Sequence, residues 1–147
     1  MAESCLAWAR DAALPALPRA LSYWEPEACG PEEWLGAAFV DTLRGLGHEV
    51  SPWIEGAKAE TLLIGCFLNP RAYTGRIQYE EGEMTRILAA LKGAARAAIV
   101  SFGSPFVFSA LGAGGLCAFS KNEPAQRAAA RALAGRLLVK GRMPVPF

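Results

Sequence analysis

The stretch 61-TLLIGCFL-68 decides the fold, because it is apolar along almost its whole length. A strand with one face in water alternates apolar and polar side chains, whereas a strand covered on both faces can be apolar throughout. The run 97-AAIVSF-102 has the same character. Together the two runs predict inner strands of a parallel sheet that is packed on both sides.

Three further segments are predicted to be strands, namely 19-RALSYW-24, 48-HEVSPWI-54 and 116-LCAFS-120. Pro52 has no backbone N–H to donate, so we expect the second of these strands to lie at an edge of the sheet or to end early. The segment that precedes all of them, up to Pro15, is expected to be helical.

Helical patterns separate the predicted strands. A helix over residues 31–47 would start at Pro31, end at glycines and bury one face, formed by Leu35, Ala38, Phe39, Thr42, Leu43 and Leu46. A second helix over residues 79–93 would bury a stripe of Met84, Ile87, Leu88 and Leu91. A third, over residues 123–135, follows the predicted cap Asn122, and its inner face is almost entirely alanine.

Strands that alternate with helices predict an α/β protein. We expect a three-layer sandwich of the flavodoxin-like type, with a mostly parallel sheet of about five or six strands and helices on both faces. The chain has 147 residues and no repeat or linker, so residues 1–147 are expected to form a single domain. In open sheets of this kind ligands bind at the carboxyl ends of the strands.

Composition and charge exclude several classes of function. Fifteen Lys+Arg residues against 14 Asp+Glu residues give a net charge of +1, which leaves no basic surface for nucleic acid. No apolar run reaches the roughly 20 residues of a membrane span, and the N-terminus lacks the pattern of a signal peptide. With one histidine and no CxxC pair among four cysteines, no metal site is expected. We interpret the cysteines as reduced thiols of a cytoplasmic protein.

The turn 101-SFGSPFVF-108 raises the question of a nucleophilic serine. The elbow that presents such a serine has the pattern G-x-S-x-G. Here Ser104 is followed by proline and phenylalanine, so the second glycine is missing. The one histidine, His48, is predicted at the opposite edge of the sheet, where it cannot act as the base. We therefore interpret Ser104 as part of a turn that ends a strand.

Phosphate binding and carboxylate chemistry are also disfavoured. The glycine-rich loop 112-GAGG-115 precedes a strand, whereas the phosphate-binding loop of a dinucleotide fold follows one. The acids Glu80, Glu81 and Glu83 begin a helix, where the helix dipole favours negative charge in any case. No second carboxylate is expected beside them. The sequence thus predicts no catalytic residue and no cofactor.

The polar stretch 69-NPRAYTGRIQ-78 is the best candidate for a binding site, because it follows a buried strand at the edge where ligands bind. Amide and guanidinium groups donate to hydroxyls or carboxylates, and tyrosine can stack on a sugar or another ring. The alternative is a solvated loop that binds nothing. The candidate ligand-binding residues are Asn69, Arg71, Tyr73, Arg76, Gln78 and Ser104.

Residues 94–147 contain four motifs in a fixed order, namely 103-GSPF-106, 116-LCAF-119, 128-AAARALAG-135 and 141-GRMPV-145. This span resembles the end of the C-terminal α/β-sandwich domain of glycoside hydrolase family 3, particularly of its β-N-acetylhexosaminidase-type members. The segment 62–78 is similar to the same domain more loosely, and the N-terminal third matches it weakly.

The resemblance implies an α/β sandwich, as the residue patterns do. In that family the nucleophilic aspartate lies in a preceding (β/α)8 barrel, as does the histidine–aspartate acid/base loop of hexosaminidase-type members. A barrel needs about 250 residues, which this chain cannot contain. The resemblance therefore implies a stand-alone homologue of the second domain, which is non-catalytic alone. The implied partners are a separate barrel glycosidase subunit, a second copy of the chain or a sugar ligand.

Met1 and the family-like ending at Phe147 favour a complete gene product over a fragment. A second hypothesis comes from another functional class. In it the chain is a small enzyme or ligand sensor on a flavodoxin-like fold, and its site is formed by residues 69–78 and the Ser104 turn. Catalytic turnover by the isolated chain would distinguish the two.

Overall fold

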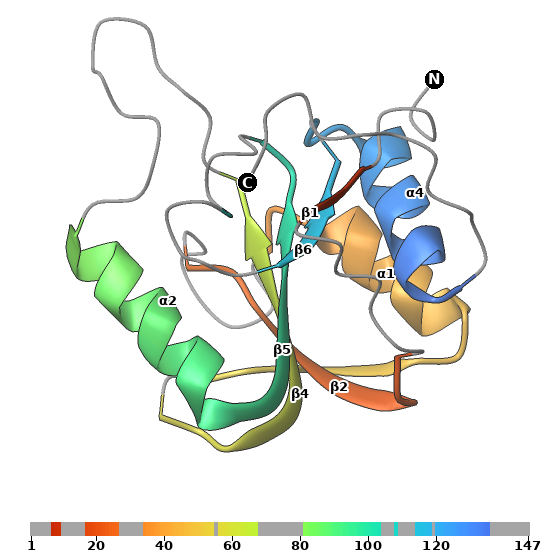
Figure 1. The fold of residues 1–147 in the computed structure, drawn as a ribbon. Coiled ribbons are helices and arrows are strands. Elements are labelled where there is room, and N and C mark those ends of the chain that lie inside the picture. The colour runs from red at the N-terminus through yellow and green to blue at the C-terminus, as the bar shows by residue number, and fades with distance from the viewer. Residues whose placement is uncertain are drawn as a thin grey trace, which may run out of the picture.

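The computed structural model describes residues 7–9, 17–26, 34–54, 56–67, 81–103, 108, 114–118 and 120–135. The described strands form one six-stranded sheet with the order β1-β6-β5-β4-β2-β3 (Figure 1). The elements, in chain order, are β1 (Ala7–Ala9), β2 (Ala20–Trp24), α1 (Ala37–Gly45), β3 (Glu49–Pro52), β4 (Ala59–Cys66), α2 (Glu81–Gly93), β5 (Ala94–Ser101), β6 (Gly115–Cys117) and α4 (Glu123–Leu133).

Strands β2 to β6 run parallel, and β1 is antiparallel to β6 at one edge. The order of the parallel strands, β3-β2-β4-β5-β6, is the flavodoxin-like order, in which the direction of winding reverses between β2 and β4. The predicted α/β fold class is therefore confirmed. The predicted N-terminal helix is wrong at residues 7–9, because these residues pair with β6, a contact that no local pattern reveals.

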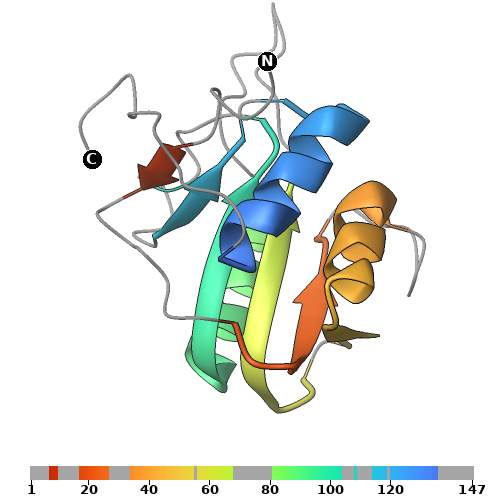
Figure 2. The same cartoon turned by 90° about the vertical axis from the view of Figure 1, so that its right-hand side faces the viewer.

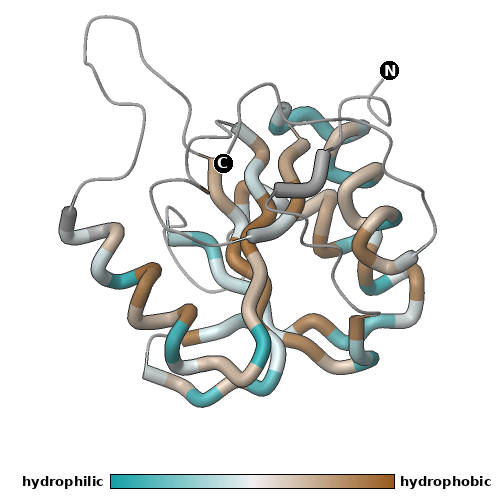
Figure 3. Tube along the Cα trace, in the orientation of Figure 1, coloured by the Kyte–Doolittle hydropathy of each residue, from teal (hydrophilic) through white to brown (hydrophobic). Residues whose placement is uncertain are grey.

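Helices cover both faces of the sheet, so the three-layer arrangement is also confirmed. Helices α1 and α4 lie on one face and α2 lies on the other (Figures 1 and 2). Two apolar clusters fill the spaces between the layers, one on the α1 and α4 side and one on the α2 side. Figure 3 shows the most hydrophobic residues gathered in the central strands, as strands covered on both faces require.

Helix α4 packs as its alanine-rich face predicts. Asn122 caps the helix, since its side-chain oxygen accepts a hydrogen bond from the backbone N–H of Ala125 at 2.9 Å. The small side chains let α4 approach both the sheet and α1 closely. Its buried positions are Ala125, Gln126, Ala128, Ala129, Ala130, Ala132 and Leu133.

Helix α1 begins later than the sequence predicts. Trp34, Leu35 and Gly36 precede it, and the first helical residue is Ala37. The physical reason is the buried carboxylate of Glu25, which accepts hydrogen bonds from the backbone N–H groups of Leu35 and Gly36 and holds them in a turn. As a result Leu35 is 55% exposed and does not belong to the buried face of the helix.

Helix α2 differs from its prediction at one position. Ile87 and Ala90 are buried, and Met84 and Leu91 are partly buried against the same cluster. Leu88 is 37% exposed, so its predicted place in the buried stripe is wrong. The 3.6-residue period places Leu88 at the flank of the stripe, where the sheet no longer covers it.

Strand β3 lies at the edge of the sheet, as Pro52 predicts. The backbone N–H groups of Glu49 and Trp53 donate to carbonyls of Arg19 and Tyr23, so the alternate positions, Val50 and Pro52, face the outer side. At Pro52 this side carries no N–H. The carbonyl of Val50 accepts a 2.9 Å hydrogen bond from the guanidinium of Arg44 on α1. The outer edge of β3 therefore offers few groups for pairing with another strand.

Candidate functional site

The candidate ligand-binding residues Asn69, Arg71, Tyr73, Arg76, Gln78 and Ser104 lie outside the described residues. The described chain reaches Phe67 after β4 and Gly103 after β5. These strands are adjacent and parallel, and Cys66 is in register with Ser101. Both predicted segments therefore begin at the carboxyl end of the sheet, next to the point between β2 and β4 where the winding reverses.

At this point the structure places a buried carboxylate that the sequence analysis did not single out. Glu25 directly follows β2 and is 2% exposed. One of its oxygens accepts a hydrogen bond from the N–H of Leu35 at 2.6 Å. The other accepts from the N–H of Gly36 at 2.8 Å and from the hydroxyl of Tyr23 at 2.6 Å. Several short hydrogen bonds make a buried charge tolerable, and they fix the turn before α1.

The phenol of Tyr23 is held in its protonated form. Burial raises its pKa well above the usual value of 10.0, and the charge of Glu25, the hydrogen bond to Glu25 and the nearby Cys66 raise it further. A protonated phenol is a donor, which is the role that Glu25 requires. The pair is thus built to hold a structure, because each group satisfies the other away from water.

Two glycines leave room for the Tyr23 ring. A Cβ atom on Gly65 of β4 would collide with the Tyr23 hydroxyl. A Cβ atom on Gly36 would lie 2.8 Å from both that hydroxyl and a Glu25 oxygen, and 3.2 Å from the ring of Phe67. The crevice where ligands of such sheets usually bind is therefore filled here by Tyr23, Glu25 and Phe67.

A second buried polar side chain joins this turn to α4. The side-chain oxygen of Gln126 accepts a hydrogen bond from the N–H of Phe39 at 3.1 Å. Its side-chain nitrogen donates to the carbonyls of Leu35 at 3.3 Å and Lys121 at 2.9 Å. Glu25 and Gln126 thus bind the same turn from two sides, and the start of α1 is fixed relative to both β2 and α4.

Cys66, Ser101 and Cys117 occupy matching positions on three neighbouring strands, and all three are buried. The hydroxyl of Ser101 accepts a 3.4 Å hydrogen bond from the N–H of Gly103. The prediction that Cys66 and Cys117 are buried thiols outside any disulfide is confirmed. Cys5 and Cys29 lie outside the described residues.

His48 lies before β3, at the amino end of that strand, and its Nδ1 is 2.9 Å from the carbonyl oxygen of Pro18. This agrees with the prediction, because the amino ends of the parallel strands lie opposite to their carboxyl ends, where Ser104 was predicted. Over the described ranges, no group of three or more His, Cys, Asp or Glu residues is placed to hold a metal ion. In the same ranges no helix has the length and hydropathy needed to span a membrane.

Glu25 and Gln126 were missed because their roles depend on long-range contacts. A weak signal for Glu25 exists, since an acid stands directly after an apolar strand and before a proline in 20-ALSYWEP-26. Gln126 is a polar residue on the otherwise apolar inner face of α4. A polar residue in such a position must find a buried partner, and this requirement could have drawn attention to it.

No protein-family model and no curated protein sequence matches the chain. Solved structures do match it. A fungal multi-domain GH3 β-N-acetylglucosaminidase with a GCN5-related glucosamine N-acetyltransferase region aligns with 99% of this chain and 18% of its own, with a TM-score of 0.64 and 16% identity. The likeness is one of fold. The chain has the fold of part of a glycoside hydrolase family 3 enzyme. This is the family that residues 94–147 resemble in sequence.

Two further structures agree. The glycoside hydrolase family 3 β-N-acetylglucosaminidase from Paenibacillus sp. str. FPU-7 aligns with 94% of this chain and 30% of its own, with a TM-score of 0.66 and 17% identity. The β-glucoside phosphorylase BglX aligns with 97% of this chain and 30% of its own, with a TM-score of 0.70 and 14% identity. The chain therefore spans less than a third of the length of these enzymes.

Proposed function

We propose that residues 1–147 form one accessory domain of the glycoside hydrolase family 3 type, which is non-catalytic alone and works with a separate (β/α)8-barrel subunit on β-N-acetylglucosaminides. The proposal rests on how much of each chain is aligned. The alignments include 94–99% of this chain but only 18–30% of the enzymes. A chain that corresponds to one part of a larger enzyme would act beside the remaining part. We also propose that the protein is cytoplasmic, because we interpret its cysteines as reduced thiols.

The chemistry of the described residues supports a non-catalytic role. Glycoside hydrolysis usually requires two carboxyl groups about 5 to 9.5 Å apart, one on each side of the bond that breaks. Among the residues whose burial is described, Glu25 is the one buried carboxylate. Hydrogen bonds from Tyr23, Leu35 and Gly36 engage it and hold a turn in place. The catalytic carboxylates would therefore come from the barrel subunit.

The segment 69–78 and Ser104 are the proposed contact with a sugar or with the barrel. They follow strands at the carboxyl end of the sheet, where open α/β sheets bind ligands. Tyr23, Glu25 and Phe67 occupy the described positions at the ends of β2 and β4, so a ligand at this edge would have to contact the segments that follow. Chemical-shift changes at Arg71, Tyr73 and Gln78 on addition of amino sugars would support this contact.

The decisive experiment measures release of nitrophenol from 4-nitrophenyl N-acetyl-β-glucosaminide. The purified chain alone should release none, and co-expression with a barrel-type glycosidase subunit from the same genome should increase the activity of that subunit. Hydrolysis by the isolated chain, abolished by Glu80→Gln or Glu81→Gln, would overturn the proposal in favour of an independent enzyme. A barrel subunit whose activity does not change in the presence of the chain would overturn the accessory role.

A further inference from the structure

The connection between β3 and β4 is unusually short. Parallel strands of one sheet are normally joined by a crossover of about a dozen residues or more, which usually contains a helix. Here residues 53–58 alone carry the chain from the carboxyl end of β3 back to the amino end of β4. Trp53 packs in the cluster on the α2 side, against Trp24 of β2. It therefore covers part of the face where a crossover helix would lie.

The short connection holds Trp53 in one position. The N–H of Ala57 donates to the carbonyl of Ile54 at 2.9 Å and closes a turn, and Gly56 supplies the positive φ of 87° that this turn requires. The indole N–H of Trp53 donates to the carbonyl of Ala57 at 3.0 Å. The backbone N–H of Trp53 donates to the carbonyl of Tyr23 at 3.0 Å. The backbone of Trp53 is thus bound to β2, and its side chain is bound to its own turn.

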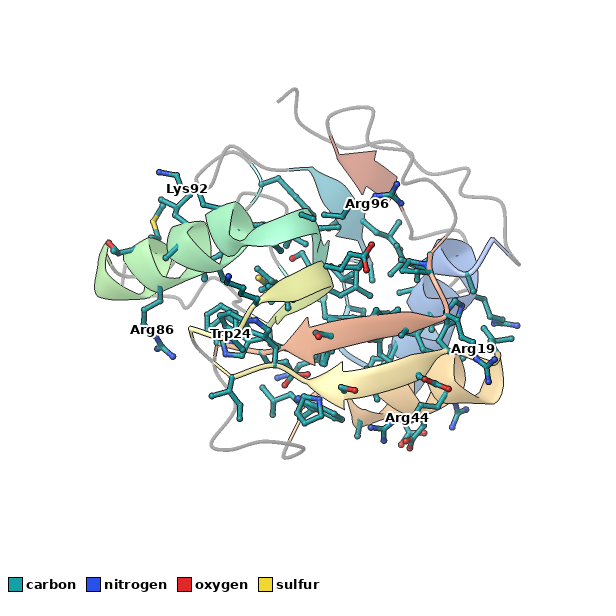
Figure 4. The ribbon with its side chains drawn as sticks, turned by 90° about the horizontal axis from the view of Figure 1, so that it is seen from below. Arg19, Trp24, Arg44, Arg86, Lys92 and Arg96 are labelled. Atoms are coloured by element: carbon teal, nitrogen blue, oxygen red, sulfur yellow. The ribbon has the colours of Figure 1, made fainter. Side chains whose placement is uncertain are left out.

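The Trp53 ring is the more exposed member of an aromatic pair with Trp24. The Trp24 and Trp53 centroids are 5.0 Å apart at an angle of 59°, and the guanidinium of Arg86 lies 5.6 Å from the Trp24 centroid. Figure 4 shows Arg86 extending from α2 on the side of Trp24, which lies at the tip of the β2 arrow. Trp24 is only 8% exposed, Trp53 is partly exposed, and the adjacent Ile54 is 64% exposed.

We propose that Trp53, with the exposed Ile54 next to it in the chain, is a stacking platform for the pyranose ring of a neutral sugar. The indole N–H is already engaged, so recognition would use the flat face of the ring. A pyranose with equatorial hydroxyls presents an apolar face of C–H groups, which suits a rigid aromatic surface.

The size of the surface favours a small ligand over a protein. One partly exposed tryptophan and one exposed isoleucine are far less than the roughly 1,000 Å² that a specific protein interface buries. The choice of a sugar rests on the proposed function, whereas the position of the platform rests on the described contacts alone. The platform lies over β2 and β3, so it is a contact additional to the one proposed for residues 69–78 and Ser104.

The test is a titration of the ¹⁵N-labelled chain with methyl N-acetyl-β-glucosaminide and with N,N′-diacetylchitobiose. The indole N–H signal of Trp53 and the amide signals of Gly56 and Ala57 should shift saturably. The indole signal of Trp34 is an internal control and should not move, because Trp34 packs against the cluster on the other side of the sheet. Sorbitol, an open-chain polyol without a ring face, should have no effect.

Variants separate a binding role from a structural one. Trp53→Ala should weaken the sugar affinity about threefold to tenfold, and Trp53→Phe should retain part of it. Ile54→Asp should also weaken binding, and because Ile54 is exposed this variant should fold normally. Leu35→Asp is the matched control, since Leu35 is a large exposed apolar residue beside α1, and it should leave the affinity unchanged.

Three results would overturn the platform. Sugar shifts confined to residues 69–78 and Ser104 would do so and would leave the proposed function standing. Unchanged affinity in Ile54→Asp and Trp53→Ala would show that the ring takes no part in binding. Shifts of the Trp53 signal that depend on protein concentration, without sugar, would assign this surface to a second copy. The nitrophenol assay is independent of all three, so a failure of the accessory role would be recognised separately.

Discussion

The hydroxyl of Tyr23 donates a 2.6 Å hydrogen bond to the carboxylate of Glu25, and both side chains are buried. This pair stands where the winding of the sheet reverses, which is the usual ligand position of the fold. The side chains that fill this position also define the turn before α1. The stability of the domain and the shape of its carboxyl edge therefore depend on the same few atoms.

Glu25→Gln is expected to lower the free energy of unfolding by about 2 to 4 kcal/mol. Its one remaining acceptor oxygen cannot serve three donors, and the new amide group would face backbone N–H groups. Urea denaturation measures the change. Glu49→Gln is the matched control, because Glu49 is exposed and its 3.4 Å ion pair with Arg19 lies at the surface. That variant should change the stability by about 0.5 kcal/mol or less.

The raised pKa of Tyr23 predicts a loss of stability in alkali. The folded state keeps the proton above pH 10, whereas the unfolded chain releases it near the ordinary value of 10.0. The unfolded state then binds fewer protons, so the free energy of unfolding falls as pH rises, by about 1.4 kcal/mol per pH unit for this group. The contribution is complete below pH 10 and is lost toward the folded-state pKa.

Tyr23→Phe isolates this contribution. The difference between wild type and variant, measured by urea denaturation from pH 8 to pH 11, should be constant up to about pH 9.5 and should shrink above it. Taking the difference between the two proteins removes the contributions that they share. A difference that stays constant throughout would show that the Tyr23 phenol is not shielded from water.

Gly65→Ala is expected to cost about 2 kcal/mol or more, because the added methyl group collides with the Tyr23 hydroxyl. Adding Tyr23→Phe should relieve part of that cost, so the two effects should not be additive. Gly45→Ala in α1 is the control. No atom lies within 4 Å of its added Cβ, and alanine should stabilise that position by about 0.5 to 1 kcal/mol. Thermal unfolding of wild type, the two single variants, the double variant and Gly45→Ala is sufficient to decide.

The outer edge of β3 is expected to resist pairing with another chain. Two substitutions would expose this edge. Arg44→Met would remove the hydrogen bond to the carbonyl of Val50, and Pro52→Thr would add an outward N–H. The double variant should self-associate at concentrations where wild type does not, as measured by sedimentation velocity. Arg127→Met on the exposed side of α4 removes the same charge far from this edge and should behave as wild type.

The sequence predicted the elements whose packing is periodic and missed those set by distant contacts. The apolar run of β4 and the alanine face of α4 appear where they were expected, because burial on two faces or on one stripe leaves a local pattern. The start of α1 was misplaced, because Glu25, ten residues before Leu35, fixes it through side-chain hydrogen bonds. Local propensity cannot report such a bond.

The candidate site shows the same division. The edge at which β4 and β5 end was predicted, since parallel strands all point the same way. The position of the Tyr23 side chain at this edge was not predicted, because it depends on the absence of a side chain at Gly65 on a neighbouring strand. A glycine inside an apolar strand indicates a close approach of another group, but it does not say which group approaches.

The hydrogen bonds of Gln126 have a consequence for biosynthesis. Residue 126 lies close to the end of the chain, yet its side chain contacts Leu35 and Phe39 at the start of the first described helix. While the protein is being made, water must serve those backbone groups until α4 has left the ribosome. We therefore expect the nascent domain to complete its native contacts late, with α1 depending on α4.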